Sequence, residues 1–214
     1  MGCVVEKEQA EATGLRAIWR KRTATDDPLQ QAANGVALFV GSGQPLYPLG
    51  IVWAIGEPGW STAISWATTP AFLAAPFVGH LNPVLGRLLV AFAGSLVTLL
   101  VTLRLGPGSG VEAYYIPALL IGACLFRRGE GAARALAIAL PLAAFILGRL
   151  LAGPDAPQAE RLQLIHFGGA FCVAAYLSYA VTRARRASVA LQETSVWAKQ
   201  QSGNPSEPRR GDHG

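Results

Sequence analysis

The polar residues best placed to do chemistry lie inside the first long apolar stretch of the chain. The run Gly41-Ser42-Gly43-Gln44-Pro45, followed by Pro48, falls within residues 28–56, which carry no charge. Glycine and proline weaken the backbone hydrogen bonds of a helix, and Gln44 would bring an amide into hydrocarbon. Transporters build substrate sites from such broken helices. Small residues and prolines also serve close packing and kinks. Two interpretations therefore stay open: a ligand site at Ser42 and Gln44, or packing alone.

A second polar group combines acids with aromatic rings. We expect its members at the non-cytoplasmic ends of the helices, where acids and aromatics together could receive a cation or a small polar ligand. Glu112 and Tyr115 are the candidate ligand-binding residues of this group. Tryptophan and tyrosine collect at membrane interfaces in any case, so interfacial anchoring explains the same pattern. The group consists of Glu57, Trp60, Glu112, Tyr114, Tyr115, Asp155, Glu160 and His166.

Signatures of catalysis are absent from the sequence. It contains no H-E-x-x-H, no G-x-S-x-G and no phosphate-binding loop. The three cysteines and three histidines are scattered, with no C-x-x-C pair. No Asp, Glu or Lys falls at the centre of a predicted membrane helix, where proton-coupled transport usually needs one. We therefore predict a protein that is not an enzyme and that has no cofactor, metal or nucleic-acid partner.

The elements that must position these residues are predicted to be membrane helices. Charged residues make up only 14% of the chain, against roughly 25% in soluble domains. Residues 28–56 and 58–86 are each 29 residues without a charge, and a crossing needs roughly 20 apolar residues. The sequence predicts an all-α transmembrane bundle with six crossings near 34–55, 61–80, 83–104, 111–126, 132–151 and 163–181. Four crossings with a buried hairpin is the alternative, because the fourth and fifth segments have only 14 uncharged residues each.

Charge predicts the orientation of this bundle. With six crossings, eleven Arg or Lys residues flank the membrane on the side of both termini, and three flank it on the other. The positive-inside rule then places both termini in the cytoplasm. The net charge of +5 reflects this topology. Arginine outnumbers lysine 15 to 3, which fits a bacterial genome rich in GC, so we expect a multi-pass protein of the bacterial inner membrane.

Three regions follow from this topology. A basic cytoplasmic segment spans residues 1–31, the six-helix domain 32–182, and a helical extension with a tail 183–214. Asp27 is the expected cap of the first helix, with Pro28 in its first turn. Residues 182–201 contain no proline or glycine. The last helix is therefore predicted to leave the membrane as one rod to about Val196, and the residues after Ser202 to be disordered.

A set of residues in the middle of the chain has a recognisable order: Gly106, Gly108-Ser109-Gly110-Val111-Glu112, Tyr115, Pro117, Phe126-Arg127-Arg128 and Glu130. This order resembles the six-helix membrane-associated (MASE-type) sensor modules of bacteria, and the resemblance covers about residues 30–185. It implies a non-catalytic sensory or scaffold module, because such modules precede cyclase, phosphodiesterase or histidine-kinase domains. About thirty residues follow the last predicted helix, so we expect a separate signalling partner in the cytoplasm or the membrane, or a homo-oligomer. A small transporter or channel built on the break at Gln44 is the alternative.

Overall fold

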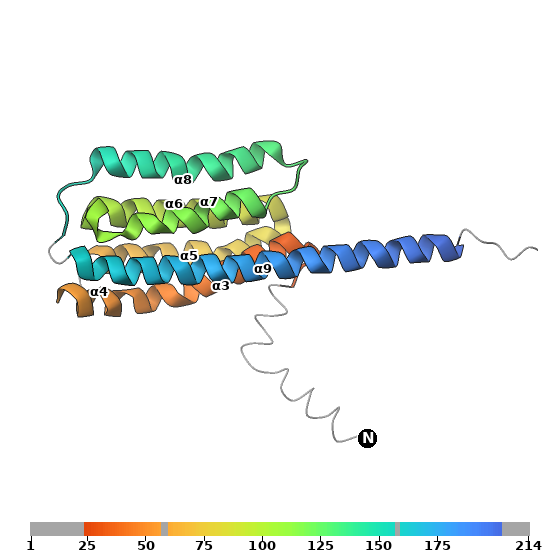
Figure 1. The fold of residues 1–214 in the computed structure, drawn as a ribbon, viewed down its shortest axis with the longest axis horizontal. Helices are drawn as coiled ribbons and strands as arrows, with labels where there is room; N and C mark the ends of the chain where they lie inside the picture. Colours follow the sequence, from red (N-terminus) through yellow and green to blue (C-terminus); the bar gives the residue numbers. More distant parts are fainter. Residues whose placement is uncertain (1–23, 57–59, 157–158, 203–214) are drawn as a thin grey trace, which may run out of the picture.

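The computed structural model describes residues 24–56, 60–156 and 159–202, and every regular element among them is helical. Figure 1 shows these helices running side by side as one bundle. The all-α prediction is confirmed. In chain order the elements are α3 (Pro28–Gly43), η2 (Gln44–Leu46), α4 (Tyr47–Ile55), α5 (Trp60–Leu81), α6 (Pro83–Leu105), η3 (Pro107–Ser109), η4 (Val111–Tyr114), α7 (Tyr115–Cys124), α8 (Gly131–Leu151) and α9 (Ala159–Ser202).

Four helical stretches are long and apolar enough to cross a membrane. They are Pro28–Ile55, Pro83–Leu105, Gly131–Leu151 and Ala159–Ala190. The shorter apolar segment Val111–Cys124 and the 22-residue α5 pack among them. The chain thus has the helices of a membrane protein, and the count of six crossings stays a prediction.

The helix starts follow local capping rules. The Asp27 carboxylate accepts hydrogen bonds from the backbone N–H groups of Leu29 (2.9 Å) and Gln30 (3.4 Å), and Pro28 occupies the first turn. Asn82 caps α6 in the same way, with proline next to it. Both caps satisfy N–H groups that have no partner inside the helix. The predicted cap at Asp27 is confirmed.

Helix α9 is a single helix of 44 residues. At 1.5 Å per residue it is about 66 Å long. Figure 1 shows it running along the bundle and then projecting beyond it. The predicted unbroken helix through Val196 is therefore confirmed, and its exit from the membrane stays a prediction. The basic segment before residue 24 and the tail after Ser202 lie outside the described residues.

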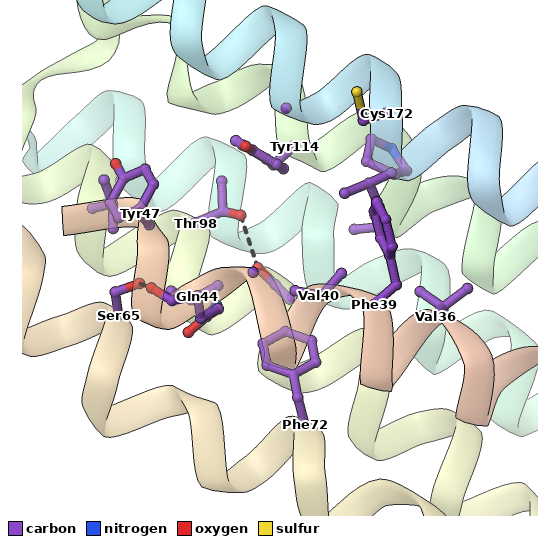
Figure 2. Close-up of a pocket in the computed structure, with 18 of the residues that line it drawn as sticks. Val36, Phe39, Val40, Gln44, Tyr47, Ser65, Phe72, Thr98, Tyr114 and Cys172 are labelled. Atoms are coloured by element: carbon purple, nitrogen blue, oxygen red, sulfur yellow. Dashed lines mark hydrogen bonds between the residues drawn. The ribbon is translucent and has the colours of Figure 1, made fainter. Parts of the chain in front are cut away.

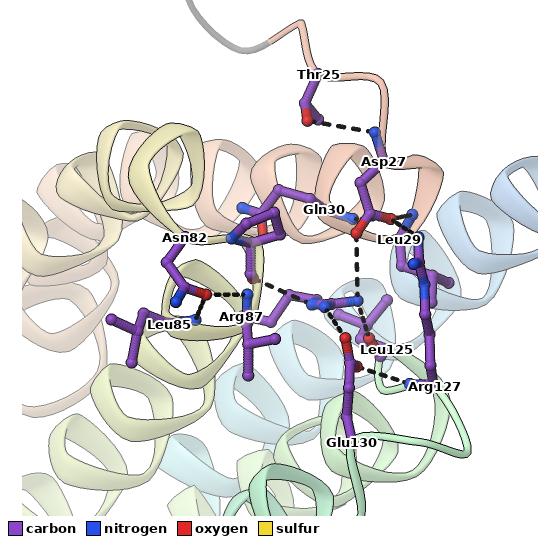
Figure 3. Close-up of polar contacts among 12 residues, drawn as sticks. Thr25, Asp27, Leu29, Gln30, Asn82, Leu85, Arg87, Leu125, Arg127 and Glu130 are labelled. Carbon is purple, nitrogen blue, oxygen red and sulfur yellow. Dashed lines mark hydrogen bonds and ion pairs between the residues drawn. The ribbon is translucent and has the colours of Figure 1, made fainter.

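A buried arginine closes one end of the bundle. The side chain of Arg87 is 1% exposed and donates to Glu130 at 2.7 Å and to the Leu125 carbonyl at 3.0 Å. Asp27 lies 3.7 Å from Arg87 and 3.2 Å from Arg127, as Figure 3 shows. These contacts join the starts of α3 and α6 to the α7–α8 turn. A buried charge is stable only with such partners.

Candidate functional site

The first long helix breaks where the sequence predicted. Pro45 and Pro48 have no N–H, so the carbonyls of Gly41 and Gln44 lose their usual partners four residues on. The chain passes through the short 3-10 turn η2 and then restarts as α4. The Gln44 carbonyl accepts the Tyr47 N–H inside that turn and also the hydroxyl of Ser65 on α5, at 3.3 Å. The neighbouring helix thus repairs the break.

The side chain of Gln44 is partly satisfied. It is 9% exposed, and its Oε1 lies 3.0 Å from the hydroxyl of Thr68 and 3.4 Å from that of Thr69. Its Nε2 donates no hydrogen bond within the described part of the chain. One end of the amide is therefore tied to α5, while the other end keeps its hydrogen-bonding capacity.

A cavity of about 520 Å³ lies beside this break. Its wall comes from α3, η2, α4, α5, α6, η4, α7 and α9, and Figure 2 shows Gln44, Thr98 and Tyr114 at the cavity. Ligand cavities in proteins commonly measure about 300–1,000 Å³ and have mostly apolar walls with a few polar groups. This cavity has that character. Its apolar wall includes Val36, Phe72, Val97, Val101, Ala118 and Ile121, and its polar groups include Ser42, Gln44, Tyr47, Ser65, Thr98 and Tyr114.

The wall of the cavity reaches the outside of the bundle. Ser42, Gly43 and Leu46 at the break are exposed, and so is Cys172 on α9, which lines the cavity too. Gln44 lies 16 residues after Pro28 and 11 before Ile55. Those separations correspond to about 24 Å and 16 Å along a helix. In a membrane with a hydrocarbon core of about 30 Å, the opening would face lipid tails.

A buried histidine joins two helices of the cavity wall, α4 and α9, to the turn η3 near the other end of the bundle. His166 on α9 is 0% exposed, and its Nδ1 lies 2.7 Å from the Ser109 carbonyl. A carbonyl can only accept, so Nδ1 carries the proton. In the neutral ring Nε2 then accepts from the hydroxyl of Tyr47, also at 2.7 Å. The histidine therefore links α9 to α4 and η3.

The four predicted ligand residues fall in two places. Ser42 and Gln44 line the cavity. Glu112 instead pairs with Arg149, and Tyr115 is buried with its ring edge against Phe145 on α8. Neither of these two residues lines the cavity.

Sequence reasoning missed several cavity residues. Tyr114 lines the cavity, and its neighbour Tyr115 does not. The 3-10 turn η4, which ends at Tyr114, determines the direction in which these side chains point. Tyr47 and Cys172 lie in apolar runs, where nothing in their spacing marks them. A Cβ at Gly169 would collide with the Tyr114 hydroxyl, so Tyr114 packs directly on the backbone of α9.

Two acidic residues of the predicted outer group, Asp155 and Glu112, have partners inside the protein. Asp155 accepts the Gly108 N–H at 2.6 Å, and Glu112 pairs with Arg149. Among the described residues no three His, Cys, Asp or Glu side chains are grouped to hold a metal ion. Glu57 lies outside them. Interfacial anchoring and a ligand site both stay open for this group, and the second oxygen of Glu112 is buried without a partner in the part of the chain that the structure describes.

Comparison with known proteins adds no assignment to this geometry, since no family model, no curated protein and no solved structure matches the chain.

Proposed function

We propose that this protein is a membrane-embedded receptor module without catalysis of its own. In this proposal a ligand binds in the cavity at the helix break. Ligand binding displaces α9, and this displacement is transmitted along the helix to a partner in the cytoplasm. One observation carries the proposal. Helix α9 lines the cavity with Ile165, Gly169 and Cys172, and the same unbroken helix continues to Ser202 beyond the bundle.

The contacts of α9 support mechanical coupling. Tyr114 on the cavity wall packs against Gly169, so a ligand that moves Tyr114 pushes on α9. Further along, Tyr176 stacks on Phe39 of α3 with ring centroids 4.7 Å apart. From Cys172 to Ser202 the helix spans 30 residues, or about 45 Å. A helix transmits a displacement over that length because its backbone hydrogen bonds keep it stiff.

The six-crossing topology belongs to the same proposal. Figure 1 places the start of α3, the α5–α6 turn, the α7–α8 turn and the exit of α9 at one end of the bundle. That end carries Arg127, Arg128 and Arg183, so the positive-inside rule assigns it to the cytoplasm. Both termini then lie inside the cell. The resemblance to six-helix sensor modules agrees with a separate signalling partner or a second copy of the chain.

Coupling between cavity and rod can be tested without knowing the ligand. Spin labels at Gly129→Cys, in the α7–α8 turn, and Thr194→Cys, on α9, report one distance in a background lacking the native cysteines. Filling the cavity with Gly94→Leu should shift that distance by about 1–2 Å, the usual size of helix shifts. Ala139→Leu adds the same side chain to an exposed position of α8 and should leave it unchanged. An identical distance with and without Gly94→Leu would refute the coupling.

A small transporter or channel is the second candidate. The convergence of Thr68 and Thr69 on Gln44 at a broken helix favours it. The wall of the cavity favours a receptor, because no Asp, Glu, Lys or Arg is among its described residues. Transport predicts that a bound probe crosses the bilayer of sealed vesicles, and that Gln44→Leu stops the movement. The receptor predicts binding without movement.

A further inference from the structure

The wall of the cavity restricts the charge of any ligand. The described residues that line it include no Asp, Glu, Lys, Arg or His. A charged group moved there from water would lose its hydration and gain no counter-charge. The exposed part of the wall, at Ser42, Gly43, Leu46 and Cys172, faces lipid tails if the helix spans the membrane as proposed. A ligand that arrives by this route is neutral and soluble in lipid.

Most hydroxyl groups at the cavity already donate within the protein. Ser42 donates to the Phe39 carbonyl at 3.1 Å, and Thr98 donates to that of Gly94 at 2.8 Å. Ser65 donates to the Gln44 carbonyl at 3.3 Å, and Tyr47 donates to His166. These four hydroxyls have no further proton to donate to a ligand, although their oxygens can still accept hydrogen bonds.

Two donors differ from the rest. The Nε2 of Gln44 and the hydroxyl of Tyr114 form no hydrogen bond within the described part of the chain. Gln44 as a residue is only 9% exposed, yet neither its Nε2 nor the Tyr114 hydroxyl is among the fully buried atoms without a partner, so both donors remain accessible to a molecule in the cavity. Figure 2 shows the two residues on different sides of the cavity, on η2 and η4. Both groups suit an oxygen that accepts hydrogen bonds.

We propose that the cavity binds a neutral, lipid-soluble molecule with a carbonyl-type oxygen, which enters from the bilayer and accepts hydrogen bonds from Gln44 and Tyr114. The inference rests on the proposed receptor function and names the class of its ligand. The apolar body of the molecule contacts the valines of α6 and the residues of α9. The oxygen fixes its orientation, because it pairs with the donors that the protein leaves open.

The test compares two probes that differ only in the oxygen. The protein in lipid nanodiscs is titrated with 2-undecanone or with undecane, and the rise in unfolding temperature gives an apparent affinity for each. In the wild type the ketone should bind about threefold to tenfold more tightly than the alkane, the usual range for one net hydrogen bond. Gly94→Leu adds four carbons to the cavity and should weaken binding of both probes, so a rise in unfolding temperature that this variant leaves unchanged comes from the effect of the probes on the bilayer.

Two variants show which hydrogen-bond donors cause the preference for the ketone over the alkane. Gln44→Met keeps the size of the side chain and removes the amide, so the preference for the ketone over the alkane should fall. The threonine hydroxyls stay satisfied in this variant, because the carbonyls of Ile64 and Ser65 lie 3.0–3.1 Å from Thr68. Tyr114→Phe should reduce the preference for the ketone and leave alkane binding intact.

Several outcomes would overturn the inference. Equal affinities for ketone and alkane in the wild type, or a preference that Gln44→Met leaves undiminished, would remove the role of the amide. Binding of 2-undecanol without binding of the ketone would mean that Gln44 presents its carbonyl to the cavity. Binding of dodecanoate as tight as that of the ketone would remove the restriction to neutral ligands. The receptor function can fail while the ligand class holds. If the ketone binds the wild type but Gly94→Leu leaves the spin-label distance unchanged, the cavity binds ligands without moving α9.

Discussion

Replacing Gly94 by leucine should stabilise this protein. Gly94 lies on α6, on the face whose residues Val90, Val97 and Thr98 also line the cavity. A Cβ built at Gly94 meets no atom within 4 Å. The four added carbons can therefore enter the cavity, where the apolar wall supplies partners that they would otherwise find only in lipid.

The expected gain is about 1–2 kcal/mol. Glycine inside a helix is destabilising by about 0.5–1 kcal/mol relative to alanine. Each close carbon contact adds about 0.1–0.2 kcal/mol, so a handful of new contacts contributes a similar amount. For a chain of this length 1 kcal/mol corresponds to about 2–4 °C in unfolding temperature. We therefore expect a rise of about 2–8 °C in a thermal unfolding assay in nanodiscs.

Gly122 provides the matched control. A Cβ there would lie 2.8 Å from Ile138 and 2.9 Å from the backbone oxygen of Ala137, so no space exists for a side chain. Gly122→Leu should therefore destabilise the protein by about 1–3 kcal/mol through overpacking. If Gly94→Leu lowered the unfolding temperature as Gly122→Leu does, the space at Gly94 would be filled and the cavity would not exist as described.

Three further predictions concern topology and buried polar contacts. A reporter active only in the periplasm should be inactive when fused after Gln201 and active when fused at Gly108, because the positive-inside rule assigns these positions to opposite sides. Glu130→Ala should destabilise the protein by about 3–5 kcal/mol in thermal or denaturant unfolding, since it leaves the buried Arg87 without its closest carboxylate. Tyr47→Phe should cost about 1–3 kcal/mol in the same assay, because the buried histidine loses its 2.7 Å partner.

Each of these predictions has a contrary result. The opposite reporter pattern would refute the six-crossing topology. Glu112→Ala removes the carboxylate partner of Arg149, whose side chain is 54% exposed, so its effect should stay below about 1 kcal/mol. Equal effects of Glu112→Ala and Glu130→Ala would mean that burial does not set the strength of these pairs. A Tyr47→Phe variant as stable as the wild type would show that the link between α4 and α9 contributes nothing.

Local chemistry explains the parts of the fold that could be predicted. The cap at Asp27 needs only a carboxylate before a helix, and the break at η2 needs only prolines that remove backbone donors. The length of α9 follows from the absence of proline and glycine in residues 182–201. Each of these features depends on residues within one or two turns, so no knowledge of neighbouring helices was required.

The side of each helix that faces its neighbours could not be predicted in the same way. Tyr114 at the end of η4 and Tyr115 at the start of α7 look equivalent in sequence, yet Tyr114 faces the cavity and Tyr115 faces α8. His166 carries no local sign of its partners, because Tyr47 and Ser109 lie 119 and 57 residues away. Packing among distant helices decides which side of each segment turns inward.

The sequence alone determined that the chain is helical and apolar, where the first helix breaks, and that a polar amide sits in that break. These properties reside in single segments. The tertiary structure alone decided that a cavity lies beside the break, which donors face it, and that α9 forms one of its walls. A cavity is the volume that side chains from many helices fail to fill, so it depends on their relative placement and leaves no trace in the order of residues.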